Sequence, residues 1–126
     1  MDTEAFRALA ARHVAERYEL DPVAATAAGI HDHDHRMPDL TGPGFGDRDA
    51  FVDRWITELE AIAPQDLGPL ERTDRALLLA DLRGQKAVRE FARWRRDPGL
   101  YANAVIRGAY YPLIRETLVL EDRLQR

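Results

Sequence analysis

The stretch that decides the fold is Phe51-Val52-Asp53-Arg54-Trp55-Ile56-Thr57-Glu58-Leu59-Glu60-Ala61-Ile62. Its apolar residues recur every three or four positions, which places them on one face of an α-helix. Its charged residues fall on the opposite face, as in a helix that is half buried. We expect this helix to begin near Asp47 and to end before Pro64, because proline cannot continue a helix interior. A helix of this kind needs other apolar helical faces to cover it.

The segments on both sides carry the same helical spacing. We expect helices over residues 3–19, 23–28, 47–62, 73–96 and 100–108, and a last one from 110 to the end of the chain. Asp21-Pro22 before the second helix and Gly29 after it are typical start and stop signals. Strand-like alternation bounded by turn residues is missing from the sequence. The prediction is an all-α fold of about five to six helices in an antiparallel or orthogonal bundle.

The long helix over 73–96 contains an apolar line with small residues at its middle. We expect the buried line to consist of Leu77, Ala80, Gly84, Ala87, Val88, Phe91 and Trp94. Small side chains would let a neighbouring helix approach closely there. Glycine costs about 1 kcal/mol relative to alanine inside a helix, and close packing is the expected compensation at Gly84.

Composition limits the size and the class of the protein. The chain of 126 residues is 45% hydrophobic and 32% charged, as expected for a polypeptide with a folded core. We expect residues 1–126 to form either a single helical domain or the N-terminal fragment of a larger helical protein. The sequence reaches Gln125-Arg126 without a residue that ends a helix, which favours the fragment.

Charge and hydropathy exclude two kinds of partner. The net charge of −4 argues against nucleic acid, whose binding proteins carry a basic excess. The only local basic run, Arg93, Arg95 and Arg96, is typical of an exposed helix end. No stretch approaches the ~20 apolar residues of a membrane span, and the start of the chain does not resemble a signal peptide. The expected localisation is cytoplasmic, with no membrane partner.

Three of the four histidines lie in a predicted loop over residues 30–46. Imidazole titrates near neutrality and is the commonest metal ligand, so His31, His33 and His35 are candidate ligands, although none is assigned as one. Alternate residues of an extended loop lie about 6.6 Å apart and share a metal only if the loop curls. Two other interpretations remain: a solvated loop whose side chains bond nearby amides, or a loop that lines a cleft with His31, Asp34 and Arg36.

The rest of the sequence offers no self-contained catalytic site. Cysteine and serine are absent, and the zinc-binding pattern His-Glu-x-x-His does not occur. Residues 42–46 are glycine-rich, but Pro43 removes an amide donor, so we expect a flexible connector rather than a phosphate loop. His13 lies at the edge of an apolar stripe, where we expect a packed, hydrogen-bonded histidine without a functional role. No catalytic residue and no cofactor are assigned to this chain.

An ordered set of residues resembles a known bacterial family. Its first part is Glu19-Leu20-Asp21-Pro22-Val23-Ala24-Ala25-Thr26-Ala27-Ala28-Gly29-Ile30-His31, followed by Asp34 and Pro38-Asp39-Leu40. Its second part is Asp74-Arg75-Ala76-Leu77, Leu82, Glu90, Arg93-Trp94, Asp97-Pro98, Tyr101, Gly108, Tyr110 and Leu113. This set resembles the N-terminal portion of the family named domain of unknown function 885.

The resemblance implies a large helical protein related to zincin-type metallopeptidases. In such a protein a downstream His-Glu-x-x-His helix would hold zinc, so zinc is expected only in a full-length relative. This chain would then be an N-terminal helical scaffold that is inactive alone, with the missing C-terminal part or another helical surface as its partner. The alternative is a small stand-alone helical interaction module without catalytic activity.

Overall fold

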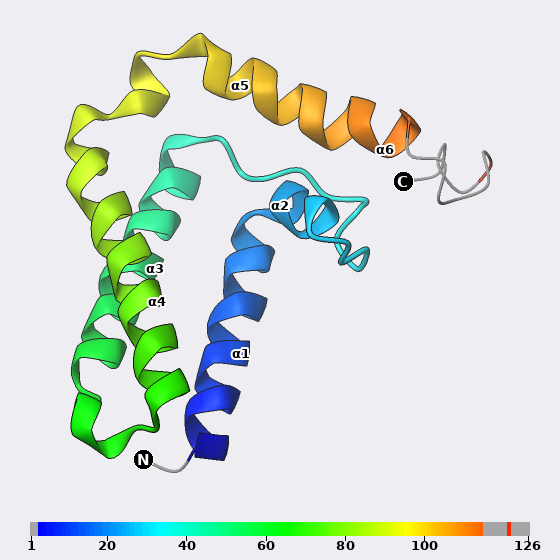
Figure 1. Ribbon diagram of the computed structural model, residues 1–126. Helices are drawn as coiled ribbons and strands as arrows, with labels where there is room; N and C mark the ends of the chain where they lie inside the picture. Colours follow the sequence, from blue (N-terminus) through cyan, green and yellow to red (C-terminus); the bar gives the residue numbers. More distant parts are fainter. Residues whose placement is uncertain (1–2, 115–120, 122–126) are drawn as a thin grey trace.

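The computed structural model describes residues 3–114 and residue 121, and the part of the chain it describes is helical without a strand (Figure 1). The all-α prediction is therefore confirmed. The α-helices are α1 (Thr3–Leu20), α2 (Pro22–Ala27), α3 (Gly42–Glu60), α4 (Pro69–Val88), α5 (Pro98–Val105) and α6 (Tyr111–Ile114). None of the described helices combines the length and the apolar character needed to cross a membrane.

Helices α1, α3 and α4 lie side by side, and α3 and α4 run antiparallel through the short connection between them (Figure 1). The core lies between these three helices. Its buried side chains are Phe6, Phe51, Val52, Trp55, Ile56, Leu59, Ile62, Leu67, Leu79 and Leu82. Every apolar residue of the predicted α3 face is in this set, so the face that decides the fold is correctly identified.

Helix α2 follows α1 after a single residue and is held by local signals at both ends. The Asp21 carboxylate accepts a hydrogen bond from the Ala24 amide at 3.1 Å, and Pro22 occupies the first turn. Gly29 has a φ of 87°, a left-handed conformation that glycine adopts without a steric cost. Both the predicted cap and the predicted stop are confirmed.

The predicted loop over 30–46 is wrong in its last part, because α3 begins at Gly42 rather than near Asp47. The Thr41 hydroxyl accepts a hydrogen bond from the Gly44 amide at 3.3 Å, and Pro43 stands in the first turn, where its missing N–H costs nothing. Residues 42–46 are thus a helix start and not a flexible connector. Gly44 is also required sterically, since a Cβ there would lie 2.5 Å from the Asp39 carbonyl oxygen.

Helix α4 differs from its prediction in both boundaries and in its buried face. It begins at Pro69 rather than Thr73 and ends at Val88 rather than Arg96. The residues buried on it are Glu71, Leu79 and Leu82, whereas Leu77 is 64% exposed. A Cβ on Gly84 would meet nothing within 4 Å, so close packing does not explain this glycine. Apart from Trp94, which is half-buried, the predicted apolar line lies on the outside of the molecule.

Helix α4 ends at Val88, and Trp94 packs against the start of α3 instead of continuing the face of α4. Two 3₁₀ turns, Arg89–Phe91 and Arg93–Arg95, flank Ala92, which is left-handed with a φ of 42°. The Trp94 ring stacks on Phe45 at the start of α3, with 5.1 Å between ring centroids. Stacking of this kind is worth about 0.5–1.5 kcal/mol beyond area burial, comparable to the strain of a left-handed alanine. The stack ties the end of α4 to the start of α3.

Helices α5 and α6 cross the end of the three-helix layer (Figure 1). Asp97 caps α5 by accepting a hydrogen bond from the Gly99 amide at 2.9 Å. The predicted break at Gly108 is wrong, because Ile106–Tyr110 form a wide π-helical turn that joins α5 to α6. Pro112 clashes with a normal turn before it, which a wider turn relieves. The predicted helix beyond Ile114, with Thr117, Leu118 and Leu124, lies outside the described residues.

Two glycines of α3 provide a matched pair of substitutions. We expect Gly44→Ala to destabilise the protein because its Cβ would overlap the Asp39 backbone. Gly46→Ala is expected to stabilise it by up to about 1 kcal/mol, since no atom lies within 4 Å of that Cβ and alanine favours a helix interior. Urea unfolding of both variants measures the difference. Equal free energies of unfolding would contradict a helix start at Gly42.

Candidate functional site

The histidine loop is organised by the buried carboxylate of Asp34. Its Oδ1 accepts a hydrogen bond from the Thr26 hydroxyl at 2.6 Å, and its Oδ2 lies 2.8 Å from Nδ1 of His31. Asp34 and Thr26 are both buried, while the His31 side chain is partly exposed. The carboxylate therefore joins α2 to the turn that follows it and fixes the orientation of the His31 ring.

The other residues of the loop face the surface near the end of α1. Arg36 donates a hydrogen bond to the Glu19 carboxylate at 2.5 Å, and Nδ1 of His33 lies 3.9 Å from the same carboxylate. The Arg36 guanidinium keeps the pKa of Glu19 below its ordinary value. His35 is exposed. The three histidines thus have separate environments.

A metal ion needs several ligands that converge on one point. Within residues 3–114 and 121, no group of three or more histidine, aspartate or glutamate side chains is arranged to hold one. Among His31, Asp34 and Arg36, the predicted cleft residues, the structure brings His31 and Asp34 together, while Arg36 pairs with Glu19. The local chemistry is that of a turn closed by side-chain hydrogen bonds, which was one of the open interpretations.

His13, the fourth histidine, lies in the core with 1% of its surface exposed. Its ring lies edge-on to Trp55 at 4.9 Å and near Phe51 at 5.3 Å. It is packed as predicted, but the predicted hydrogen bond is wrong: neither ring nitrogen has a hydrogen-bond partner among the residues that the structure describes. Burial and Arg17 lower the pKa of His13 below 6.5, against opposing contributions from Asp81 and Glu16.

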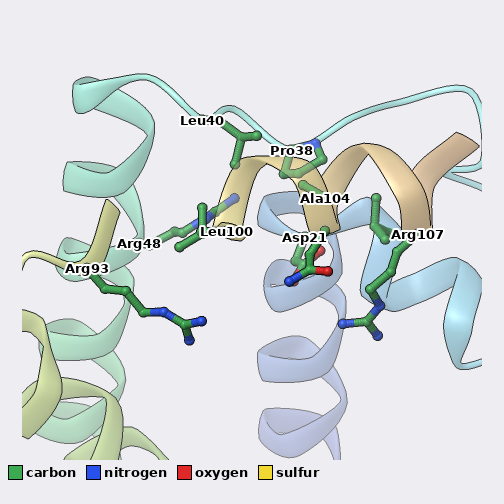
Figure 2. A pocket seen from close by; sticks show the side chains of 10 residues that line it. Asp21, Pro38, Leu40, Arg48, Arg93, Leu100, Ala104 and Arg107 are labelled. Atoms are coloured by element: carbon green, nitrogen blue, oxygen red, sulfur yellow. The ribbon is translucent and has the colours of Figure 1, made fainter. Parts of the chain in front are cut away.

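A cavity of about 430 Å³, here named the arginine cavity, lies where α5 passes over α2 and α3 (Figure 2). Its polar lining residues are Asp21, Arg48, Arg93, Asn103 and Arg107. Its apolar lining residues are Val23, Pro38, Leu40, Leu100 and Ala104. Figure 2 shows Arg93 and Arg107 extending into the same space from opposite sides. The cavity has the size of a small-molecule site.

The charge of this lining is opposite to that of the protein. Three arginines face one aspartate in a chain whose net charge is −4. Arg93 pairs with Asp97 at 2.7 Å and lowers the pKa of that carboxyl, so part of its charge is compensated locally. Arg48 donates to the Leu20 carbonyl oxygen at 3.4 Å and lies over the Phe45 ring. The cavity therefore favours an anion.

A second cavity, of about 350 Å³, adjoins the first and is here named the histidine cavity. It is lined by His13, Arg17, Leu20, Asp21, Arg48, Phe51, Asp81 and Gln85. Asp21 and Arg48 line both cavities. The buried imidazole of His13 thus lines a cavity that shares Asp21 and Arg48 with the arginine cavity.

Sequence reasoning missed these cavities and identified only one of their arginines, as part of an exposed helix end. Arg48, Arg93 and Arg107 belong to three different elements that are far apart along the chain. The only local signal was the polar His13 on an apolar stripe. No protein-family model, curated protein or solved structure matches this chain.

Replacing Asp34 with alanine should destabilise the protein by about 1–3 kcal/mol, because the Thr26 hydroxyl and the His31 ring both lose a charged, buried partner and the hydroxyl keeps only the Pro22 carbonyl oxygen at 3.2 Å. Asp32→Ala, two residues away on the exposed side of the same turn, should change stability by less than about 0.5 kcal/mol. Thermal or urea unfolding compares the two. Similar losses in both variants would contradict the buried role of Asp34.

The lowered pKa of buried His13 predicts that the free energy of unfolding decreases on acidification. The unfolded chain takes up a proton at the ordinary histidine pKa of 6.5, and the folded chain takes it up only at lower pH. The contribution of His13 is thus fully present above pH 6.5 and decreases as the pH falls toward the folded pKa. Unfolding of the wild type, His13→Phe and the control His35→Ala between about pH 7.5 and pH 5.5 tests this. The free energy of unfolding should depend less steeply on pH in His13→Phe than in the wild type and in His35→Ala. An unchanged pH dependence in His13→Phe would contradict this role of His13.

Proposed function

We propose that this chain is a non-catalytic helical scaffold segment that resembles the N-terminal part of the zincin-like family named domain of unknown function 885. Its task is to dock against a helix of a catalytic part. The zinc ion, the water it activates and the general base would all belong to that part, because the described residues contain no ligand group for a metal.

The residues of the resemblance occupy structural junctions, which supports a scaffold role. Asp21 caps α2 and Gly29 ends it, and Asp97 caps α5. The Tyr101 hydroxyl donates a hydrogen bond to the Trp94 carbonyl oxygen at 2.7 Å, which joins α5 to the turn after α4. These contacts fix helix directions and involve no reactive group.

The observation that carries the proposal is the uncovered apolar face of α4 and of the turn after it, here named the α4 outer face. Its members are Leu70, Leu77, Ala80, Gly84, Ala87, Val88 and Phe91, all exposed. Leu77 and Phe91 are 64% and 67% exposed, which is unusual for large apolar side chains on one face. The sequence has the pattern of a buried face, and no described residue covers it.

The spacing of this face indicates a helix as the partner. Leu70, Leu77, Gly84 and Phe91 recur at intervals of seven residues, and Ala80 and Ala87 fill the intermediate positions. A seven-residue repeat with two apolar positions matches a second helix packed at a small angle. The small residues at the middle allow the two backbones to approach closely. An amphipathic helix of the catalytic part is therefore the proposed occupant.

A stand-alone interaction module is the second candidate. It is favoured by a core that is complete within the described residues, where Trp55, Leu59 and Leu82 have no exposed surface. Such a module would use the α4 outer face for self-association or for a separate protein. The two candidates differ in what the purified chain does in solution.

The scaffold proposal predicts a monomer without zinc and without peptide hydrolysis, whose α4 outer face binds a hydrophobic dye. The double variant Leu77→Glu, Phe91→Glu should lose most of the dye fluorescence and keep its melting temperature, because both side chains are exposed. Sedimentation velocity, metal analysis, dye titration and thermal unfolding are the measurements. Arg72→Glu, an exposed change on α4 away from the outer face, is the matched control and should keep the dye signal.

Two results would contradict the scaffold proposal. Stoichiometric zinc together with peptide hydrolysis would show a complete site in this chain. A stable dimer that dissociates in the double variant would show that a second copy covers the α4 outer face, which is the behaviour of the stand-alone module.

A further inference from the structure

We propose that the arginine cavity binds a small organic acid, with its carboxylate or phosphate group on Arg48 and Arg107 and a second polar group reaching toward His13. This inference does not depend on the scaffold role. It concerns a different face of the protein from the α4 outer face.

Two of the arginines form no ion pair with a carboxylate among the described residues. Arg48 donates a hydrogen bond to the Leu20 carbonyl oxygen and lies over the Phe45 ring, and its charge helps to lower the pKa of Asp39 without forming an ion pair with it. Arg107 forms no ion pair with any carboxylate of the described residues. Other arginines of this chain do pair with carboxylates. Examples are Arg54 with Glu16 at 2.7 Å and Arg83 with Glu60 at 2.7 Å. Guanidinium groups without an ion-pair partner that line one cavity favour an anionic ligand.

The chemistry of arginine indicates the type of anion. The planar guanidinium presents parallel N–H donors that match the two oxygens of a carboxylate or a phosphate. Arg48 is already oriented, since the Phe45 ring and the Leu20 carbonyl hold its guanidinium. Pre-oriented donors lose less entropy when a ligand binds.

The remaining walls indicate that the anion belongs to an organic molecule. Leu40, Leu100 and Val23 contribute apolar surface to the same cavity. A bare inorganic ion would leave this surface in contact with water, whereas an apolar ligand body would cover it. The volume of about 430 Å³ admits a body of several carbon atoms.

His13 provides the second, independent sign of a ligand. It is 1% exposed, and no described residue forms a hydrogen bond with either of its ring nitrogens. It lines the cavity that shares Arg48 and Asp21 with the arginine cavity. A buried polar group without a partner costs free energy that a ligand can recover. A neutral imidazole offers one donor and one acceptor, which suits a hydroxyl group. The ligand class is therefore an organic acid with a hydroxyl at its far end.

The experiment titrates the full chain with four probes. They are para-hydroxyphenylacetate, para-hydroxyphenyl phosphate, the uncharged para-hydroxyphenylacetamide and inorganic phosphate. Calorimetry should show saturable binding of at least one of the two organic acids, and the amide and inorganic phosphate should bind at least about tenfold more weakly. The preference between the two acids identifies the anionic group.

Variants assign the binding to the cavity. Arg48→Gln and Arg107→Gln should each weaken affinity for the preferred acid about tenfold or more, as expected for loss of a charge-assisted hydrogen bond. Arg72→Gln, an exposed arginine of α4 outside both cavities, is the matched control and should bind as the wild type does. If Arg48→Gln does not fold, Arg107→Gln decides, since Arg107 is exposed and holds no core contact.

Nuclear magnetic resonance of the wild type gives a readout that needs no variant. A saturating amount of the preferred acid should shift the His13 ring signals and the Asn103 amide signals, and the exposed His35 should stay unchanged. The inference is overturned if neither acid binds, if the amide or inorganic phosphate binds as tightly, or if Arg107→Gln leaves the affinity unchanged.

Discussion

Burial of the Trp55 indole is the interaction on which the rest of the structure depends. The ring has no exposed surface, its Nε1 donates a hydrogen bond to Glu16 of α1 at 2.9 Å, and the Arg12 guanidinium lies 4.8 Å from its centroid. A large aromatic side chain with one polar edge fixes both the distance and the rotation of the neighbouring helix. Leu79 and Leu82 of α4 complete the same cluster, so one residue of α3 sets the positions of both neighbours.

The position of α4 determines in turn where the cavities form. Once Leu79 and Leu82 face the core, the end of α4 lies beside the start of α3, and Trp94 stacks on Phe45. Ala92 adopts its left-handed conformation to allow this. The chain then leaves in a new direction as α5 and passes over α2. The core thus sets the directions of the helices that enclose the space beneath α5, and three arginines line this space.

The sequence predicted those features that local chemistry decides. The Asp21 cap and the Gly29 stop depend on one or two residues each, and the α3 face is the only apolar face of that helix. Helix α4 has two candidate faces, the leucine pair at 79 and 82 and the line through Leu77 and Phe91. Both faces show the same helical period, so periodicity alone does not predict which of them is buried. In the structure the leucine pair is the buried face, and it belongs to the same core cluster as Trp55.

The arginine cavity illustrates why a charge pattern read along the chain misses a site. Arg93 looked like part of an exposed basic run, Arg48 stands between Asp47 and Asp49, and Arg107 is an isolated charge in its segment. The net charge of −4 argued against nucleic acid as a partner. That reasoning applies to large surfaces, where charges add over many ångströms of screened solvent.

In a partly enclosed cavity the local charges decide which ligand charge is favoured, since screening by water and salt is weaker there. Phe91 of the α4 outer face and Arg93 of the arginine cavity lie on either side of Ala92. A helix that docks on the first would therefore hold in place the turn that carries the second. The two proposed sites, joined by so short a turn, are expected to influence each other's affinity equally in both directions, because thermodynamic linkage is reciprocal.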